Sequence, residues 1–151
     1  MSKSKSPEPA ESDAVAFRSL RFGWWALAVS ISLGLLLEAL HGFKIGWYLD
    51  VGNEMRRLML TLAHTHGTLL ALVNIAAGAS AKIFGANVLP ELAAGAVRLA
   101  AILMPLGFLL GGLVIHDGDP GLGVLLVPLG GFLLVYGIVA IAIAVSSSRR
   151  A

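Results

Sequence analysis

The stretch GWWALAVSISLGLLLEALH, from Gly23 to His41, decides the fold. It is apolar over about the twenty residues that a helix needs to cross a ~30 Å hydrocarbon core. Trp24 and Trp25 stand at its start, where aromatic residues of membrane proteins commonly meet the lipid headgroups. We therefore predict a first membrane-spanning helix over about residues 22–41.

Three more apolar runs predict spanning helices over about residues 54–78, 90–115 and 122–145. None alternates polar and apolar residues, so a β-barrel is not expected. Of the 151 residues, 13% are charged, about half the share of a soluble domain. The sequence predicts an all-α, integral membrane, four-transmembrane-helix bundle in the lipid bilayer, as one domain over residues 15–146.

Polar segments flank and connect these spans. Residues 1–14 are polar and predict a disordered tail, and residues 147–151 a short C-terminal tail. The aromatic connector 42–53 is expected at the membrane interface, with Asn53 capping the second helix. The stretch HDGDPG, residues 116–121, predicts a turn, because it lacks the oxygen ligands of a calcium loop.

Lys and Arg residues are divided unevenly between the two sides of the predicted bundle. One side holds Lys3, Lys5, Arg18, Arg21, Lys82, Arg98, Arg149 and Arg150, and the other holds Lys44, Arg56 and Arg57. Because cytoplasmic loops collect positive charge, we predict cytoplasmic termini and extracytoplasmic connectors 42–53 and 116–121. The expected location is the inner membrane of a prokaryote.

Small residues and prolines predict how the helices pack. Gly107 and Gly111 form a pair suited to close helix contact, and Pro105 and Pro128 are expected to kink their helices. Both prolines stand in a Pro-Leu-Gly motif, which we attribute to convergent composition rather than to duplication. A stripe of small residues is expected to be the packing face of the second helix, namely Ala63, Gly67, Ala71, Asn74 and Gly78.

Ionisable residues concentrate toward the extracytoplasmic ends of the spans. Glu38 and His41 are three residues apart and share a helix face, at depths of about 9 and 5 Å by helical rise. His64 lies about 10 Å deep on the second helix. We predict that these three side chains share one band, which His116 closes at the end of the third helix.

His64 and His66 are separated by about 200° around the helix axis and cannot share a face. His64 lies on a polar stripe with Thr61 and Thr68, so it is the residue expected to join the band. His66 requires another neighbour, a second site or a partner subunit.

Imidazole is a good ligand for copper and for haem iron, and a neighbouring carboxylate orients it. One hypothesis is therefore a binding or electron-transfer subunit that holds copper or haem. Its cofactor ligands would be His41, His64 and His66, and a metal would be held by Glu38, His41, His64 and His116. A di-iron centre is not expected, because it needs carboxylates from all four helices and the second and fourth spans offer none at this depth.

The stretch AHTHG, Ala63 to Gly67, resembles the histidine-bearing helices of haem-copper oxidases and nitric-oxide-reductase-type proteins. The resemblance covers about five residues, and the chain lacks the further spans and histidines of those families. It implies a ligand role for His64 and His66 alone, on opposite sides of one helix.

Two alternatives remain open. In a proton- or ion-handling transport component, the same groups would line a hydrated path that continues through Asn74, Ser30 or Tyr136. In a structural subunit of a homo-oligomer or larger membrane complex, the histidines would be hydrogen-bonding groups between helices. An enzyme is not expected, because no nucleophile motif is visible and the chain has no cysteine. Nor is nucleic acid an expected partner, because the basic residues flank the spans.

Overall fold

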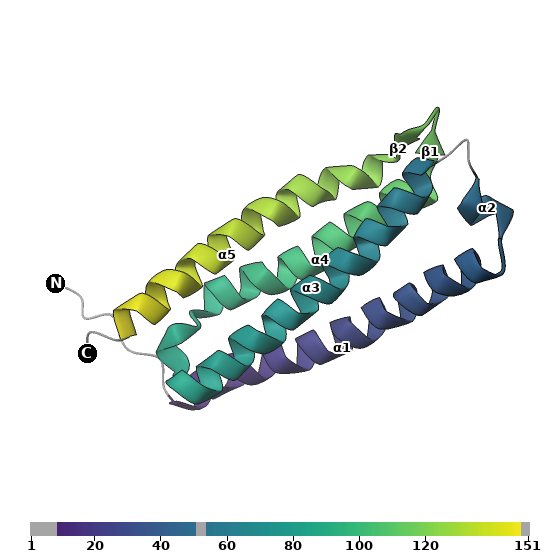
Figure 1. The fold of residues 1–151 in the computed structure, drawn as a ribbon. Coiled ribbons are helices and arrows are strands. Elements are labelled where there is room, and N and C mark those ends of the chain that lie inside the picture. Colours follow the sequence, from purple (N-terminus) through teal and green to yellow (C-terminus); the bar gives the residue numbers. More distant parts are fainter. Residues whose placement is uncertain (1–8, 51–53, 149–151) are drawn as a thin grey trace.

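The computed structural model describes residues 9–50 and 54–148. Within them, four long helices lie side by side (Figure 1). They are α1 Pro9–Gly42, α3 Glu54–Phe84, α4 Glu91–Leu113 and α5 Leu126–Ser148. All four are long and apolar enough to cross a membrane, which confirms the predicted all-α architecture with four candidate spans.

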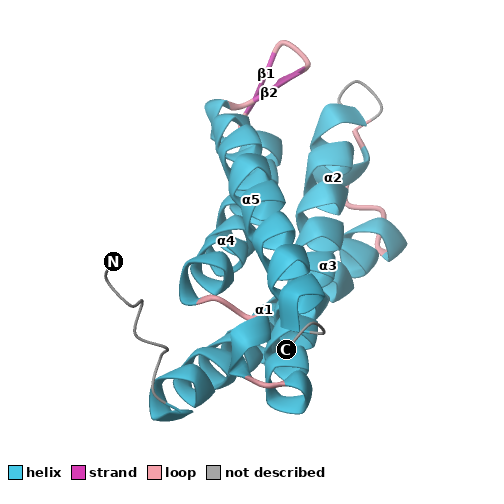
Figure 2. Ribbon diagram, turned by 90° about the vertical axis from the view of Figure 1, so that its left-hand side faces the viewer, coloured by secondary structure: helices cyan, strands magenta, loops and turns pink. Residues whose placement is uncertain are grey.

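Short elements join the long helices (Figure 2). They are α2 Gly46–Leu49, the 3-10 helix η2 Ala86–Val88, the strands β1 Ile115–His116 and β2 Asp119–Pro120, and the 3-10 helix η3 Leu122–Leu125. We call the end of the bundle with α2 and the strands the hairpin end. The opposite end, where α1 begins and α5 ends, is the termini end.

The turn predicted over residues 116–121 is a two-stranded hairpin. His116 of β1 pairs with Asp119 of β2. Between them, Asp117 and Gly118 both have positive φ angles, 50° and 88°. Two positive φ angles are what a type I′ turn requires, and an Asp-Gly pair favours this turn. The hairpin reverses the chain between α4 and α5.

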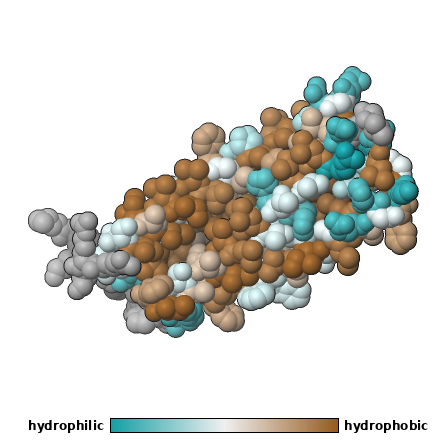
Figure 3. Space-filling model, viewed as in Figure 1, coloured by the Kyte–Doolittle hydropathy of each residue, from teal (hydrophilic) through white to brown (hydrophobic). Residues whose placement is uncertain are grey.

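The long helices pack in the order of the sequence. α1 packs on α3, α3 on α4, and α4 on α5, while α1 makes a smaller contact with α4. Among the described long helices, α5 packs substantially only on α4. The face in Figure 3 is largely hydrophobic, and its hydrophilic residues gather at the hairpin end. This distribution suits helices whose outer faces contact lipid.

Small residues allow close approach between α1 and α3. The packing stripe predicted on α3 is confirmed, because all of its members are buried: Ala63, Gly67, Ala71, Asn74 and Gly78. A Cβ atom on Gly23 of α1 would lie 2.9 Å from the Ala71 carbonyl oxygen. A Cβ atom on Gly78 would lie 2.8 Å from the Ala16 carbonyl oxygen. Larger residues at these positions would push the two helices apart.

Glycines also shape the contacts of α4. A Cβ atom on Gly107 would lie 2.9 Å from Val127 at the start of α5, and Gly111 faces the segment that leads to it. These positions confirm the predicted close contact. Gly112 faces α3 instead, where a Cβ atom would lie 2.8 Å from Met59. Glycines therefore let α4 approach neighbours on two of its faces.

The first two long helices extend beyond their predicted limits at the termini end. α1 begins at Pro9, so residues 9–14, expected in the tail, are helical. α3 continues to Phe84. The Asp13 carboxylate lies 2.7 Å from the Lys82 ammonium, so the two extensions meet in an ion pair. The remaining tail residues and the predicted cap Asn53 lie outside the described residues.

Pro105 and Pro128 have different surroundings. Pro105 lies inside α4, as predicted. Pro128 comes two residues after α5 begins and follows the 3-10 helix η3. The N–H of Leu126 donates to the carbonyls of Gly123 and Val124. Pro128 has no N–H with which to bond the Val124 carbonyl four residues earlier. Pro128 therefore follows a change of helix type at the entry to α5, and not a break in the middle of a span.

Candidate functional site

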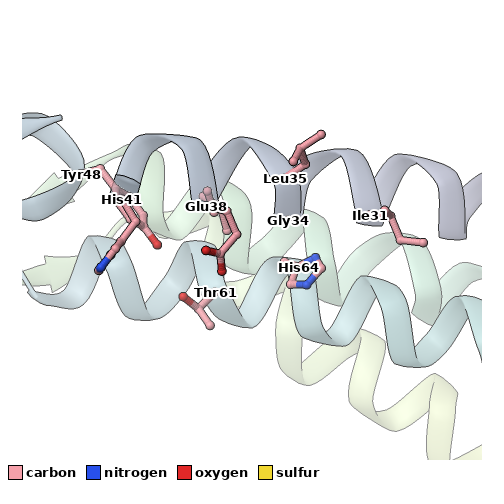
Figure 4. Close-up of a pocket in the computed structure, with 9 residues that line it drawn as sticks. Ile31, Gly34, Leu35, Glu38, His41, Tyr48, Thr61 and His64 are labelled. Atoms are coloured by element: carbon pink, nitrogen blue, oxygen red, sulfur yellow. The ribbon is translucent and has the colours of Figure 1, made fainter. Parts of the chain in front are cut away.

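A groove of about 480 Å³ lies between α1 and α3, toward the hairpin end. Its lining residues are Ile31, Gly34, Leu35, Leu37, Glu38, His41, Tyr48, Thr61 and His64. In Figure 4, the side chains of Glu38 and His41 point from α1 toward α3. The structure thus brings Glu38, His41 and His64 to one groove, as the sequence predicts.

A second cavity, of about 630 Å³, shares His41, Tyr48 and Thr61 with the first. It is also lined by Glu54 and Arg57, whose charged groups lie 3.9 Å apart. We call the two cavities together the α1–α3 groove. Its polar end is at the start of α3, and its apolar end lies along α1 deeper in the bundle.

The ring of His64 is held by α1. Its Nδ1 atom lies 2.8 Å from the carbonyl oxygen of Ser30. A carbonyl only accepts, so Nδ1 carries a proton, and in the neutral ring Nε2 keeps a lone pair. The ring packs over Gly34, where a Cβ atom would lie 2.7 Å from Nδ1. Ser30 and Gly34 therefore fix both the position and the tautomer of His64.

Glu38 and His41 are exposed, and neither side chain has a hydrogen bond or ion pair with any described residue. Both lie in the last turn and a half of α1, which ends at Gly42. Helical rise places Glu38 about 6 Å from that end. Their polar atoms are thus available to water or to a ligand.

Tyr48 is a lining residue that sequence reasoning missed. It belongs to the single turn α2, is 5% exposed, and packs with Leu37 of α1 and Leu60 of α3. The sequence presents it only as one of the aromatic residues of a connector. Its return to the groove depends on how that connector folds back, for which the sequence contains no local signal.

His66 faces away from the groove, as its angular position predicts. Its ring centroid lies 4.7 Å from that of Phe108 on α4, and its Nδ1 atom lies 3.0 Å from the carbonyl oxygen of Leu62. The neighbour that the sequence left open is therefore Phe108, within the same chain. Contacts between α3 and α4 place it there, and residue spacing within α3 does not reveal it.

His116 is exposed on strand β1 and lines neither cavity of the α1–α3 groove. The structure therefore does not bring it to Glu38, His41 and His64. The prediction placed it at the end of the third helix. The hairpin instead carries it into the connector between α4 and α5.

No group of three or more His, Asp or Glu side chains is placed to hold a metal ion within residues 9–50 and 54–148. Glu38, His41 and His64 line the same groove without forming such a cluster. The described part of the chain thus lends no support to the copper or haem hypothesis.

The polar path expected of a transport component was to continue through Ser30, Asn74 or Tyr136. Asn74 is 1% exposed and donates to the Leu70 carbonyl of its own helix. Tyr136 is exposed on α5. Between described residues, no hydrogen bond joins these three side chains to one another. The polar groups of the groove therefore stay in the hairpin half of the bundle.

Comparison with known proteins gives no relative for this arrangement. No family model, no curated protein and no solved structure matches the chain.

Proposed function

We propose that this protein is a small membrane protein that binds an amphipathic small molecule in the α1–α3 groove. The observation that carries the proposal is the gathering of Glu38 and His41 beside His64 between two candidate spans, where neither Glu38 nor His41 has a side-chain hydrogen bond or ion pair with any described residue. Ionisable groups in such positions are costly unless they serve a ligand or a path. A concave site with a few converging polar groups is the usual form of a ligand site.

The groups in the groove indicate which ligand chemistry fits. The Glu38 carboxylate accepts hydrogen bonds, and so does the Nε2 lone pair of neutral His64. The complementary head is one that donates, such as a hydroxyl or an amine. Ile31 and Leu35 line the deeper part and suit an apolar body. A ligand with a donor-bearing head and an apolar tail would enter from the bilayer.

We place the hairpin end outside the cytoplasm, in a prokaryotic inner membrane. The basic residues support this orientation, because Arg18, Lys82 and Arg98 lie at the termini end. Cytoplasmic sides of membrane proteins are enriched in such residues. The α1–α3 groove would then open in the outer leaflet.

A steric block tests the proposal. Thr61 lines both cavities of the groove, so Thr61→Trp fills it. Leu69→Trp is the matched control, because Leu69 is 58% exposed on the same helix and lines neither cavity. Wild type and both variants are purified in one mild detergent, and their organic extracts are compared by mass spectrometry.

We expect one compound to be enriched over bulk lipid in the wild type and in Leu69→Trp, and to fall at least about tenfold in Thr61→Trp, the loss of about 1.4 kcal/mol of binding. Identical extracts from all three proteins would overturn the proposal. Stoichiometric copper or haem that is lost in His64→Ala would replace it with the metal hypothesis.

A further inference from the structure

Arg98 of α4 has more hydrogen-bonding capacity than the described protein uses. Its Nη1 atom donates to the Ser19 hydroxyl of α1 at 3.0 Å, and Ser19 is 1% exposed. A guanidinium has five N–H donors. The bond to Ser19 is the only hydrogen bond that Arg98 makes with described residues, so most of its donors remain free. A guanidinium in a membrane-spanning helix needs a partner for them.

The guanidinium is accessible from outside the bundle. Arg98 lines a groove of about 530 Å³ between α4 and α5, which we call the α4–α5 groove. Gly95 also lines this groove, and the position that a Cβ atom of residue 95 would take lies 4.0 Å from Nη2 of Arg98. Tyr136 adds a phenol from α5 and is 52% exposed.

The charge of this groove favours an anion. Glu91 also lines it, but its carboxylate lies 3.2 Å from the guanidinium of Arg18. The positive charge of Arg18 and the negative charge of Glu91 cancel. The charge of Arg98 therefore remains, and the three residues together carry a net charge of +1.

The level of Arg98 suits a lipid headgroup. Its partner Ser19 precedes Trp24 by five residues, which is about 8 Å of helix toward the termini end. Trp24 and Trp25 are 61% and 71% exposed, as residues at the membrane interface are. Toward the interior, Leu99 and Leu133 line the same groove and offer an apolar surface.

We propose that the α4–α5 groove binds the phosphate of an anionic phospholipid in the leaflet at the termini end. Arg98 donates hydrogen bonds from its free N–H groups to two phosphate oxygens, because the planar guanidinium matches the spacing of two such oxygens. Tyr136 donates to the same headgroup, and the acyl chains lie against Leu99 and Leu133. Inorganic phosphate shares the chemistry of the headgroup, but it has no apolar part that would contact Leu99 and Leu133. Basic pockets between spanning helices bind lipid headgroups in this way.

The test uses the full chain in detergent with equal amounts of phosphatidylglycerol and phosphatidylcholine, followed by native mass spectrometry. We expect the wild type to retain phosphatidylglycerol preferentially. Arg98→Gln should lower that retention at least about tenfold, a loss of about 1.4 kcal/mol, and Arg98→Lys should restore part of it. Ser19→Ala removes the protein partner of Arg98 but keeps the charge, so it should retain the lipid.

A second pair of variants covers the case in which Arg98→Gln does not fold. Gly95→Phe places a ring in the α4–α5 groove. Gly131→Phe is its control, because a Cβ atom at Gly131 meets nothing within 4 Å and the residue does not line this groove. Only Gly95→Phe should lose phosphatidylglycerol.

Three outcomes would overturn the proposal. The first is equal retention of both lipids by the wild type, or retention of phosphatidylglycerol by Arg98→Gln at the wild-type level. The second is displacement of phosphatidylglycerol by millimolar inorganic phosphate, which would assign a site for a free anion. The third is dissociation of an oligomer in Arg98→Gln with unchanged lipid retention, which would assign the carboxylate of a partner chain.

Discussion

The Nδ1 atom of His64 lies 2.8 Å from the carbonyl oxygen of Ser30, across the interface between α3 and α1. A carbonyl oxygen has two lone pairs, so Ser30 can accept this bond and still serve its own helix. The contact joins the two helices at the level of the α1–α3 groove. It also fixes the tautomer that leaves Nε2 as an acceptor.

Gly34 provides the space for this contact, so His64 and Gly34 should be coupled in stability. His64→Ala should lower the free energy of unfolding by about 1–3 kcal/mol through the lost bond and the cavity it leaves. Gly34→Ala should also destabilise, because the new methyl group collides with the ring. In the His64→Ala background, Gly34→Ala should be nearly neutral. Unfolding in mixed micelles measures all four proteins, and additive effects would contradict the coupling.

The ring contact between His66 and Phe108 predicts a role in packing between α3 and α4. His66→Ala should destabilise by about 1–3 kcal/mol, whereas His66→Phe should lose less, because it keeps an aromatic ring against Phe108. Neither variant should change ligand retention in the α1–α3 groove, which His66 does not line. Loss of a bound compound in His66→Phe would show that His66 takes part in a site.

The hairpin between α4 and α5 requires Gly118. Its φ angle of 88° is unfavourable for any residue with a Cβ atom, so Gly118→Ala should cost about 1 kcal/mol. Gly42→Ala is the control, because Gly42 has no positive φ angle and a Cβ atom there meets nothing within 4 Å. Thermal unfolding should separate the two variants. Equal unfolding temperatures for Gly118→Ala and Gly42→Ala would contradict the requirement for glycine in this turn.

The orientation of the bundle is testable because the chain has no cysteine. Phe43 follows the end of α1, and Asn87 lies in η2, which packs near the start of α1. Single cysteines at these two positions would thus stand at opposite ends of the bundle, and both positions are exposed. On intact cells, a membrane-impermeant maleimide should label Phe43→Cys and leave Asn87→Cys unlabelled until the cells are opened. The opposite pattern would reverse the proposed sidedness.

Much of the fold follows from local sequence. The long apolar runs predict the four helices, and the spacing of small residues predicts the buried face of α3. Predicted helix limits were less accurate at the termini end. The composition of the segment from Pro9 to Ala14 predicts a tail, whereas the structure has a helix there. Asp13 of this segment pairs with Lys82, which is 69 residues away in the chain, so no local pattern reveals the contact.

The candidate site was predictable only in part. Helical rise and angle predict that Glu38, His41 and His64 lie together. The position of each side chain depends only on its own straight helix and on the contact of that helix with its neighbour. Tyr48 and Phe108 were not predictable as partners. One depends on the path of a connector and the other on the rotation of α4 against α3.

The spatial order of the long helices repeats their order in the chain. During synthesis, each long helix after α1 therefore enters the membrane when its main packing partner is already there: α1 for α3, α3 for α4, and α4 for α5. Closing the short chain segment between helices that follow one another in sequence costs little entropy. Each contact can therefore form while the rest of the chain is still being translated. Among the described long helices α5 packs substantially only on α4, so the α1–α3 groove would be complete before the ribosome releases the last span.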